Sequence, residues 1–159
     1  MNLEDGLAPP ERLASKIGVA KRVAASAGQE LFVNARADVY LRGMATGDAA
    51  VTETLRRARM YREAGADGLF VPGLVEPDAI RTIAHEAGLP LNVLARPTLG
   101  PVEELRALGV RRLSVGGSLA LAALGLARRA AHELLTQGTY AALFADGVKG
   151  AELNGWFAR

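Results

Sequence analysis

The stretch AGADGLFVPGL, residues 64–74, contains the signal that decides the fold. Gly65 follows a helical pattern, and a short run of apolar, β-forming residues begins shortly after it. Glycine adopts positive φ at little cost, so it commonly closes a helix before a tight loop and a buried strand. The stretch therefore predicts the end of a helix, a short connection and a strand.

The same pattern occurs four times in the chain. The other three copies are AGQELFVNARAD at 27–38, AGLPLNVLARPT at 87–98 and LGVRRLSVGGS at 108–118. Their strand runs are apolar with little polar alternation, which is typical of strands covered on both faces. Because helical patterns separate the runs, the right-handed crossover rule predicts parallel strands.

The helical patterns and the opening residues complete a βα series. The predicted helices occupy about 11–27, 48–64, 76–87, 101–108 and 118–137, and the prolines Pro10, Pro77 and Pro101 stand at or near the first turn of three of them. The opening MNLED reads as the end of one more strand. Two architectures accept five such units: a complete doubly wound α/β sheet, or the C-terminal part of a TIM-type (β/α)8 barrel.

Composition narrows the class of protein. The chain has 159 residues, so we expect a single domain over 1–159, with 138–159 as a helical appendage. Absence of cysteine excludes disulfides, thiolate metal sites and a cysteine nucleophile. Lysine and arginine total 19 against 17 acids, and we interpret the arginine cluster RRARMYR at 56–62 as a solvated helix face rather than a nucleic-acid site. With neither a membrane-length apolar run nor an export signal visible, we expect a cytoplasmic protein without membrane or nucleic-acid partners.

Polar residues gather where the predicted strands end. Both architectures place ligands at the carboxyl ends of parallel strands. The residues found there are Glu4, Asp5, Asn34, Arg36, Asp38, Pro72, Gly73, Asn92, Arg96, Gly116, Gly117 and Ser118. Paired acids can hold a hard cation directly or through its waters, an arginine can grip a carboxylate, and the N–H groups of a Gly-rich turn before a helix can bind an anion.

Each of these signals has a structural alternative. Glu4 and Asp5 could be an ordinary pair of acids in a loop before a helix, and Arg36 with Asp38 could form a salt bridge across the rim. A tight βα turn alone would explain both glycines of VGGS at 115–118. His85 and His132 fall inside predicted helices, so we expect no catalytic role for them, and Trp156 is interpreted as an anchor in a packed or intersubunit contact.

The combination of NLEDG, FVNARADVYLRG, AGADGLFVPGL, PLNVLA and LGVRRLSVGGSLALAAL resembles the isocitrate lyase and phosphoenolpyruvate mutase superfamily. The resemblance runs from residue 2 to the ELNGWF tail. It implies a βα barrel, here beginning at about the fourth strand, that binds Mg²⁺ and acts on small 2-oxo acids or enolpyruvyl compounds. It also implies homo-oligomers, dimers or tetramers, that exchange a C-terminal helix.

The resemblance assigns roles to individual residues. Glu4 would lie in the metal site, directly or through water, with Asp5 beside it, and Arg36 would bind the substrate carboxylate or the developing enolate. We also expect Asn92, Gly116, Gly117 and Ser118 to contact substrate. The family's aspartate ligands for Mg²⁺ belong to strands that precede the ED strand and have no counterpart in this sequence.

The sequence departs from the known subgroups in its loops. Lyases of this family carry a lysine, cysteine, glycine and histidine motif after the ED strand, and mutases carry a lysine, threonine and asparagine loop; here the loop reads GLAPPERLAS, residues 6–15. Pro72 stands where those lyases place a glutamate. Three hypotheses remain: decarboxylation of an oxaloacetate-like acid, which needs no cysteine acid; another carbon–carbon lyase or phosphonate chemistry; or a non-catalytic barrel fragment that needs a complementary half.

Overall fold

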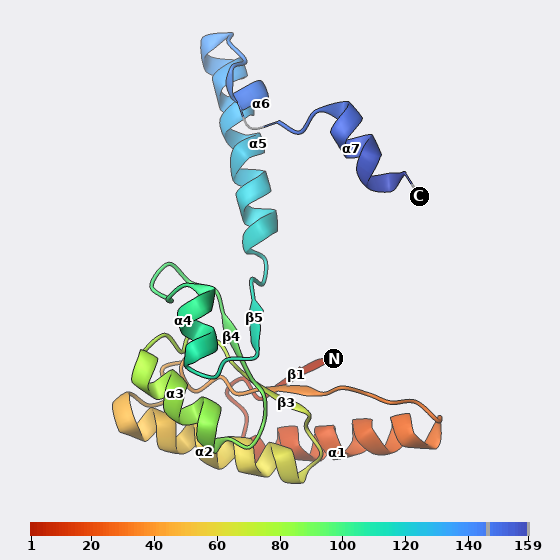
Figure 1. The fold of residues 1–159 in the computed structure, drawn as a ribbon, viewed down its shortest axis with the longest axis vertical. Helices are drawn as coiled ribbons and strands as arrows, with labels where there is room; N and C mark the ends of the chain where they lie inside the picture. Colours follow the sequence, from red (N-terminus) through yellow and green to blue (C-terminus); the bar gives the residue numbers. More distant parts are fainter. Residues whose placement is uncertain (146, 159) are drawn as a thin grey trace. The chain divides into compact units, whose positions relative to one another are not determined.

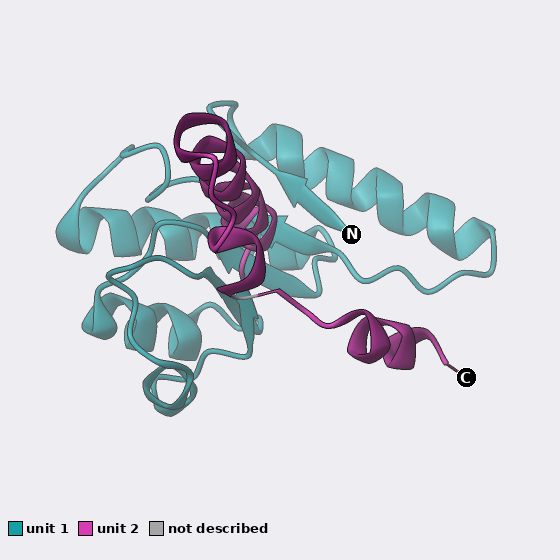
Figure 2. Ribbon diagram, turned by 90° about the horizontal axis from the view of Figure 1, so that it is seen from above, with its two compact units in different colours: residues 1–114 teal, residues 115–159 magenta. Residues whose placement is uncertain are grey.

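The computed structural model describes residues 1–145 and 147–158, and the chain divides into two compact units at residues 114 and 115 (Figures 1 and 2). The first unit holds the strands β1 (Asn2–Glu4), β2 (Asn34–Arg36), β3 (Gly68–Val71), β4 (Leu91–Leu94) and β5 (Arg112–Ser114), with the helices α1 (Pro10–Ser26), α2 (Gly47–Glu63), α3 (Pro77–Glu86) and α4 (Val102–Ala107). The second unit holds α5 (Ser118–Gln137), α6 (Ala142–Ala145) and α7 (Gly150–Phe157).

The five strands form one parallel sheet whose spatial order follows the chain, β1-β2-β3-β4-β5. A doubly wound sheet reverses its strand order at a switch point, and this sheet contains no such reversal. Consecutive parallel pairing is the arrangement found in a (β/α)8 barrel. The sheet therefore resolves the choice that the sequence left open, in favour of part of a TIM-type barrel.

The predicted helix ends are confirmed by the backbone. Gly28, Gly65, Gly88 and Gly109 all have positive φ, between 64° and 99°, and each follows one of the helices α1–α4. Pro10 and Pro77 occupy first-turn positions of α1 and α3, whereas Pro101 caps α4. The β2 strand begins later than its apolar run suggested, because residues 31–33 lie outside the hydrogen-bonded ladder.

One hydrophobic core joins the sheet to helices α1–α4. The helices contribute buried apolar side chains to this core: Leu13 and Ile17 of α1, Leu55, Ala58 and Tyr61 of α2, Ile80 and Ile83 of α3, and Leu105 of α4. The strands contribute Ala35, Leu69, Val71, Leu91 and Val93. Helices α1 and α2 contact each other directly. At the 20–33 cal/mol per Å² typical of apolar burial, this cluster supplies the main stabilisation of the unit.

The opposite face of the same strands carries polar side chains beside the buried Phe70 of β3. Side chains alternate along a strand, so Asn34, Arg36 and Asn92 point away from the core residues Ala35 and Val93. Asn34 Nδ2 donates to Asn2 Oδ1 over 3.1 Å, and Ser114 Oγ donates to Asn92 Oδ1 over 3.1 Å. This face is covered as expected, since Asn34 and Asn92 are 2% exposed, but it is not uniformly apolar, because its polar residues pair across neighbouring strands.

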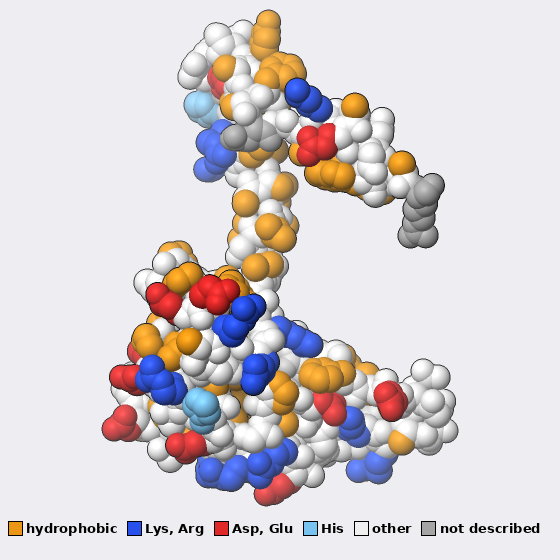
Figure 3. Space-filling model, viewed as in Figure 1, with side chains coloured by type: hydrophobic (Ala, Val, Ile, Leu, Met, Phe, Trp, Pro, Cys, Tyr) orange, Lys and Arg blue, Asp and Glu red, His pale blue; other side chains and the backbone are white. Residues whose placement is uncertain are grey.

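The second unit has a different surface. Several of its large apolar side chains are more than 60% exposed, among them Leu119, Leu121 and Leu124 of α5 and Trp156 and Phe157 of α7. Figure 3 shows hydrophobic side chains along α5. None of the helices in the described ranges has the length and apolar character needed to cross a membrane. The appendage predicted at 138–159 contains α6 and α7, and its exchange between subunits stays a prediction.

Candidate active site

The site is built on the carboxyl ends of β1 and β2, which are neighbours in the sheet. Glu4 and Arg36 are directly paired residues of the two strands, and their side chains form an ion pair with Nη1–Oε2 of 2.5 Å. Asp5 and Asp38 follow the same two strand ends, and the carboxylate of each is fully buried. The parallel register therefore brings together four of the polar residues that the sequence placed at strand ends.

Arg36 is held in a fixed orientation by two carboxylates. Its Nε donates to Asp38 Oδ1 over 2.6 Å and its Nη2 donates to Asp38 Oδ2 over 3.1 Å, a bidentate pair. The hydrogen bond that Arg36 donates to Asp38 is the main cause that raises the pKa of Arg36, while burial opposes it and the charges of Asp38, Glu4 and Asp5 add to it. The salt bridge considered as the structural alternative is thus present in the structure.

The ion pairs leave part of the Arg36 guanidinium available. A guanidinium has five N–H donors, and Asp38 and Glu4 engage three of them. Its side chain is 23% exposed, whereas Asp38 is completely buried. A carboxylate approaching the rim could therefore accept hydrogen bonds from the remaining donors without displacing the buried Asp38.

Asp5 belongs to a second, deeper network. Its Oδ1 accepts the backbone N–H of Asp38 over 2.9 Å, and its Oδ2 accepts from Arg57 Nη1 over 2.7 Å and from the Tyr61 hydroxyl over 2.5 Å. Burial, together with the hydrogen bond to Asp5, raises the pKa of Tyr61, so the hydroxyl keeps its proton. Both oxygens of Asp5 are consequently occupied by donors of the protein.

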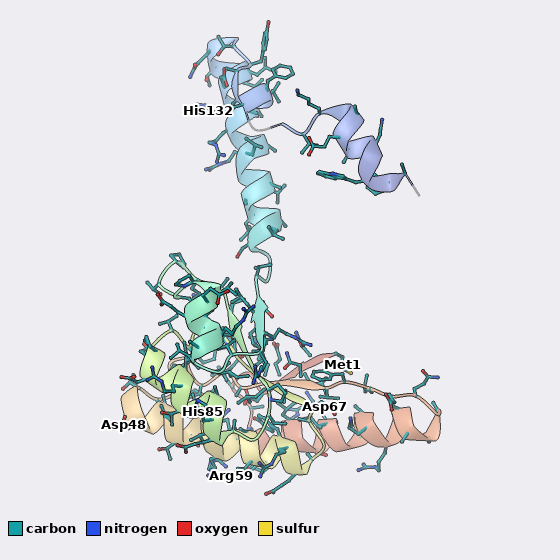
Figure 4. All side chains as sticks on the ribbon, in the orientation of Figure 1. Met1, Asp48, Arg59, Asp67, His85 and His132 are labelled. Atoms are coloured by element: carbon teal, nitrogen blue, oxygen red, sulfur yellow. The ribbon has the colours of Figure 1, made fainter. Side chains whose placement is uncertain are left out.

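Arg57 and Tyr61 correct the interpretation of the arginine cluster at 56–62. Arg56, Arg59 and Arg62 are exposed as predicted (Arg59 is labelled in Figure 4), but Arg57 and Tyr61 are buried. The i, i+4 spacing puts both on the face of α2 that also carries Ala50, Thr54 and Ala58. The spacing of Arg57 and Tyr61 relative to Ala50, Thr54 and Ala58 was the signal in the sequence that both are buried. The prediction of a solvated helix face missed it because a charged arginine is usually exposed.

Asn92 lies on the same polar face, on β4. It is 2% exposed, its Oδ1 is occupied by Ser114, and its Nδ2 has no hydrogen-bond partner among the residues described. A buried amide with an unused donor can bind an acceptor on a ligand, because leaving that donor unpaired is costly. Asn92 thus has the chemistry expected of a substrate-binding residue.

The remaining predicted residues are not part of this cluster. Pro72 directly follows β3, and Arg96 is exposed after β4. Gly116, Gly117 and Ser118 belong to the second unit, where Gly117 caps α5 and Gly116 has a φ of 54°. His85 lies on α3 and His132 on α5, as predicted (Figure 4).

The described residues do not by themselves build a metal centre. Within 1–145 and 147–158, no group of three or more histidine or acidic side chains is arranged to hold a metal ion. Asp5 and Asp38 are saturated by arginine, tyrosine and backbone donors, whereas Glu4 is 56% exposed. Of these three carboxylates, Glu4 is therefore the one that fits a metal ion or a metal-bound water.

Comparison with known proteins defines the class. The phosphoenolpyruvate phosphomutase family matches residues 1–135, and the chain belongs to this family within the isocitrate lyase and phosphoenolpyruvate mutase superfamily. An uncharacterised Mycobacterium tuberculosis protein is 38% identical over 120 residues, which are 73% of this chain and 43% of that protein. The oxaloacetate decarboxylase of Pseudomonas entomophila is 34% identical over 97 residues, 58% of this chain and 34% of that enzyme.

Solved structures confirm the fold. A candidate phosphonomutase from Burkholderia cenocepacia superposes with a TM-score of 0.78 and 36% identity, over 87% of this chain and 57% of the other. A phosphonopyruvate hydrolase in complex with oxalate and Mg²⁺ superposes with a TM-score of 0.70 at 23% identity, over 97% and 56% of the two chains. The chain thus spans about half the length of the relatives it matches.

Proposed function

We propose that the full-length protein containing this chain is a Mg²⁺-dependent lyase that cleaves a carbon–carbon bond in a small 2-oxo acid, by decarboxylation of an oxaloacetate-type substrate. The observation that carries the proposal is Arg36, held by Asp38 and Glu4 with two N–H donors left at the rim. The similarity to an oxaloacetate decarboxylase supports the choice of reaction. The absence of cysteine fits it as well, because loss of CO₂ needs no cysteine acid.

Decarboxylation develops negative charge on an enolate next to the breaking bond, and the active site must stabilise this charge. The bond between C3 and C4 breaks, C4 leaves as CO₂, and the electron pair moves into the enolate of pyruvate, whose C3 then takes a proton. Arg36 would bind the C1 carboxylate or the developing enolate oxygen through its free N–H groups. Asn92 would donate its unused amide N–H to the same substrate. Contact of Gly116, Gly117 and Ser118 with an anionic group stays a prediction, and the N–H of Ser118 already donates to the carbonyl of Val115 over 3.1 Å.

Mg²⁺ is proposed as the cofactor of the full-length protein, with Glu4 holding the ion or one of its waters. Bound there, the cation would supply positive charge to the enolate and carboxylate oxygens. Glu4 already approaches Arg36, so one carboxylate would connect the metal site to the substrate-binding arginine. Cytoplasmic location and homo-oligomers built by exchange of the C-terminal helix also stay predictions.

Phosphonate chemistry is the second candidate, supported by the 36% identity to a candidate phosphonomutase. Both reactions pass through an enolate of pyruvate, so the rim described above serves either. A panel of 2-oxo acids and phosphonates, tested with and without Mg²⁺, separates the two by the bond that breaks. The third hypothesis, a fragment that is inactive alone, is tested by running the isolated 159-residue chain beside the full-length protein.

The decisive variant is Arg36→Ala in the full-length protein. We expect kcat/KM to fall by at least about 100-fold, on the order of 3 kcal/mol of lost charge-assisted contact. Binding of oxalate, a planar dianion that mimics the enolate of pyruvate, should weaken in parallel when measured by calorimetry with Mg²⁺. The matched control is Arg81→Ala, which removes an exposed arginine of α3 whose ion pair within residues 1–145 and 147–158 is with Asp78. Unchanged kinetics and unchanged oxalate affinity in Arg36→Ala would make Arg36 a purely structural residue.

A further inference from the structure

The network around Asp5 reaches the rim through the backbone of Asp38. Asp5 Oδ1 accepts the Asp38 N–H, and the Asp38 side chain in turn grips Arg36 through Nε and Nη2. The backbone N–H of Asp5 also donates to the carbonyl of Arg36 over 3.3 Å. The position of Asp5 therefore fixes both the strand end that carries Arg36 and the carboxylate that orients it.

Asp5 is itself held from α2. Arg57 and Tyr61 lie one turn apart on that helix and both donate to Asp5 Oδ2, and Arg57 Nε donates to Glu53 Oε1 over 2.7 Å. The side chains of Arg57 and Asp5 are 9% and 0% exposed, and Tyr61 is fully buried. A buried carboxylate with three donors has little freedom, because losing any one of them leaves charge or a polar group without a partner.

We propose that Asp5, Arg57 and Tyr61 are positioning residues that fix Arg36 for substrate binding, and that Asp5 acts in this way instead of as a metal ligand. The inference rests on the proposed role of Arg36. Its structural basis is separate, since it lies in the continuous contacts from α2 through Asp5 and Asp38 to the guanidinium. None of the three residues touches the substrate in this assignment.

Tyr61→Phe tests the inference with the smallest change, because it removes one hydroxyl and keeps the buried ring. In the full-length protein with Mg²⁺, we expect oxalate affinity to fall about tenfold, as for loss of one hydrogen bond to a charged group. In an Arg36→Lys background, where the bidentate fork is already gone, the same change should cost less than twofold. A merely structural hydroxyl would lower the melting temperature equally in both backgrounds and leave the affinities additive.

A second pair of variants keeps the inference testable if Tyr61→Phe folds poorly. Arg57→Lys retains the charge but loses the contacts of the guanidinium with Asp5 and Glu53, so affinity should again fall. The neighbouring Arg56 contacts Glu53 and Glu11, with no contact to Asp5, and is 44% exposed, so Arg56→Lys is the matched control and should bind oxalate normally.

The outcomes distinguish this inference from the proposed function. If Arg36→Ala weakens oxalate binding but folded Tyr61→Phe and Arg57→Lys bind normally, the positioning role is overturned and the proposed function stands. Equal losses from Tyr61→Phe in both backgrounds also overturn the positioning role. If Arg36→Ala itself binds oxalate normally, the proposed function fails first.

Discussion

The two ends of the β-strands carry ion pairs of the same kind but with different surroundings. At the amino end, Lys21 Nζ contacts both oxygens of Asp67, and Asp67 also accepts the backbone N–H of Val33 over 2.8 Å. Both side chains there are about one-third exposed. At the carboxyl end, the carboxylates of Asp5 and Asp38 are fully buried, and the cation Arg36 keeps unused donors.

The difference indicates that the amino ends of the strands stabilise the fold, whereas the carboxyl ends present a side chain for ligand binding. The Lys21–Asp67 pair joins α1 to the loops before β2 and β3, since Lys21 also donates to the carbonyl of Leu31. The hydrogen-bonding groups of this pair bind other groups of the protein, which is consistent with a purely structural role. At the carboxyl end, burial immobilises the acids so that one arginine is presented at the rim, as expected for the end of a barrel that binds ligands. Three predictions test this contrast.

The largest effect on stability at the amino end is expected from Gly68→Ala. A Cβ there would lie 2.9 Å from Asn34 Oδ1 and 3.2 Å from Phe32 Cζ. Because Asn34 is buried and bonded to Asn2, it must shift, and we expect a loss of about 1–2 kcal/mol in the free energy of unfolding. Urea unfolding of the full-length protein measures this loss. Gly155→Ala, where a Cβ meets no atom within 4 Å, is the control; an equally stable Gly68→Ala would contradict the close packing.

Asp67→Asn tests whether the amino end is structural only. We expect at most about 1 kcal/mol of lost stability, because the pair is part-exposed and screened, and an unchanged affinity for oxalate. Asp78→Asn, at an exposed helical pair, should change neither quantity. A substantial loss of oxalate affinity in Asp67→Asn would break the division between the two ends.

The smallest expected effect is a change of stability with pH that depends on Glu53. This residue of α2 accepts a hydrogen bond from Arg57 on the same helix. Hydrogen bonds from Arg56 lower the pKa of Glu53 to about 2, with burial opposing them and Arg57 adding to them. A carboxyl whose pKa is depressed on folding stabilises the protein above its unfolded value of about 4.3 and loses that contribution as pH falls toward 2. Glu53 is part-exposed, so the contribution is below about 1 kcal/mol. The melting temperatures of wild type and Glu53→Gln should differ at pH 6, and the difference should shrink below about pH 4 and close toward pH 2. A constant gap would contradict the ion pairing.

Much of the fold followed from local patterns in the sequence. Glycine at the helix ends and apolar runs after it predicted the four helix-strand connections of the sheet, because positive φ and buried strands are properties of short segments. The same rule located Glu4, Arg36 and Asn92 at one edge, since parallel strands end together. The order of the strands in the sheet could not be predicted from local patterns, because it depends on pairing between segments far apart in the chain.

The sequence by itself determined the βα repeat, the membership of the family and the identity of the rim arginine, all of which depend on local residue type and spacing. The tertiary structure decided the partners of each charge. Arg57 lies 52 residues from Asp5 along the chain, and Tyr61 lies 56 residues from it. Only the packing of α2 against the sheet brings them together, and it makes Asp5 a buried acceptor of three hydrogen bonds.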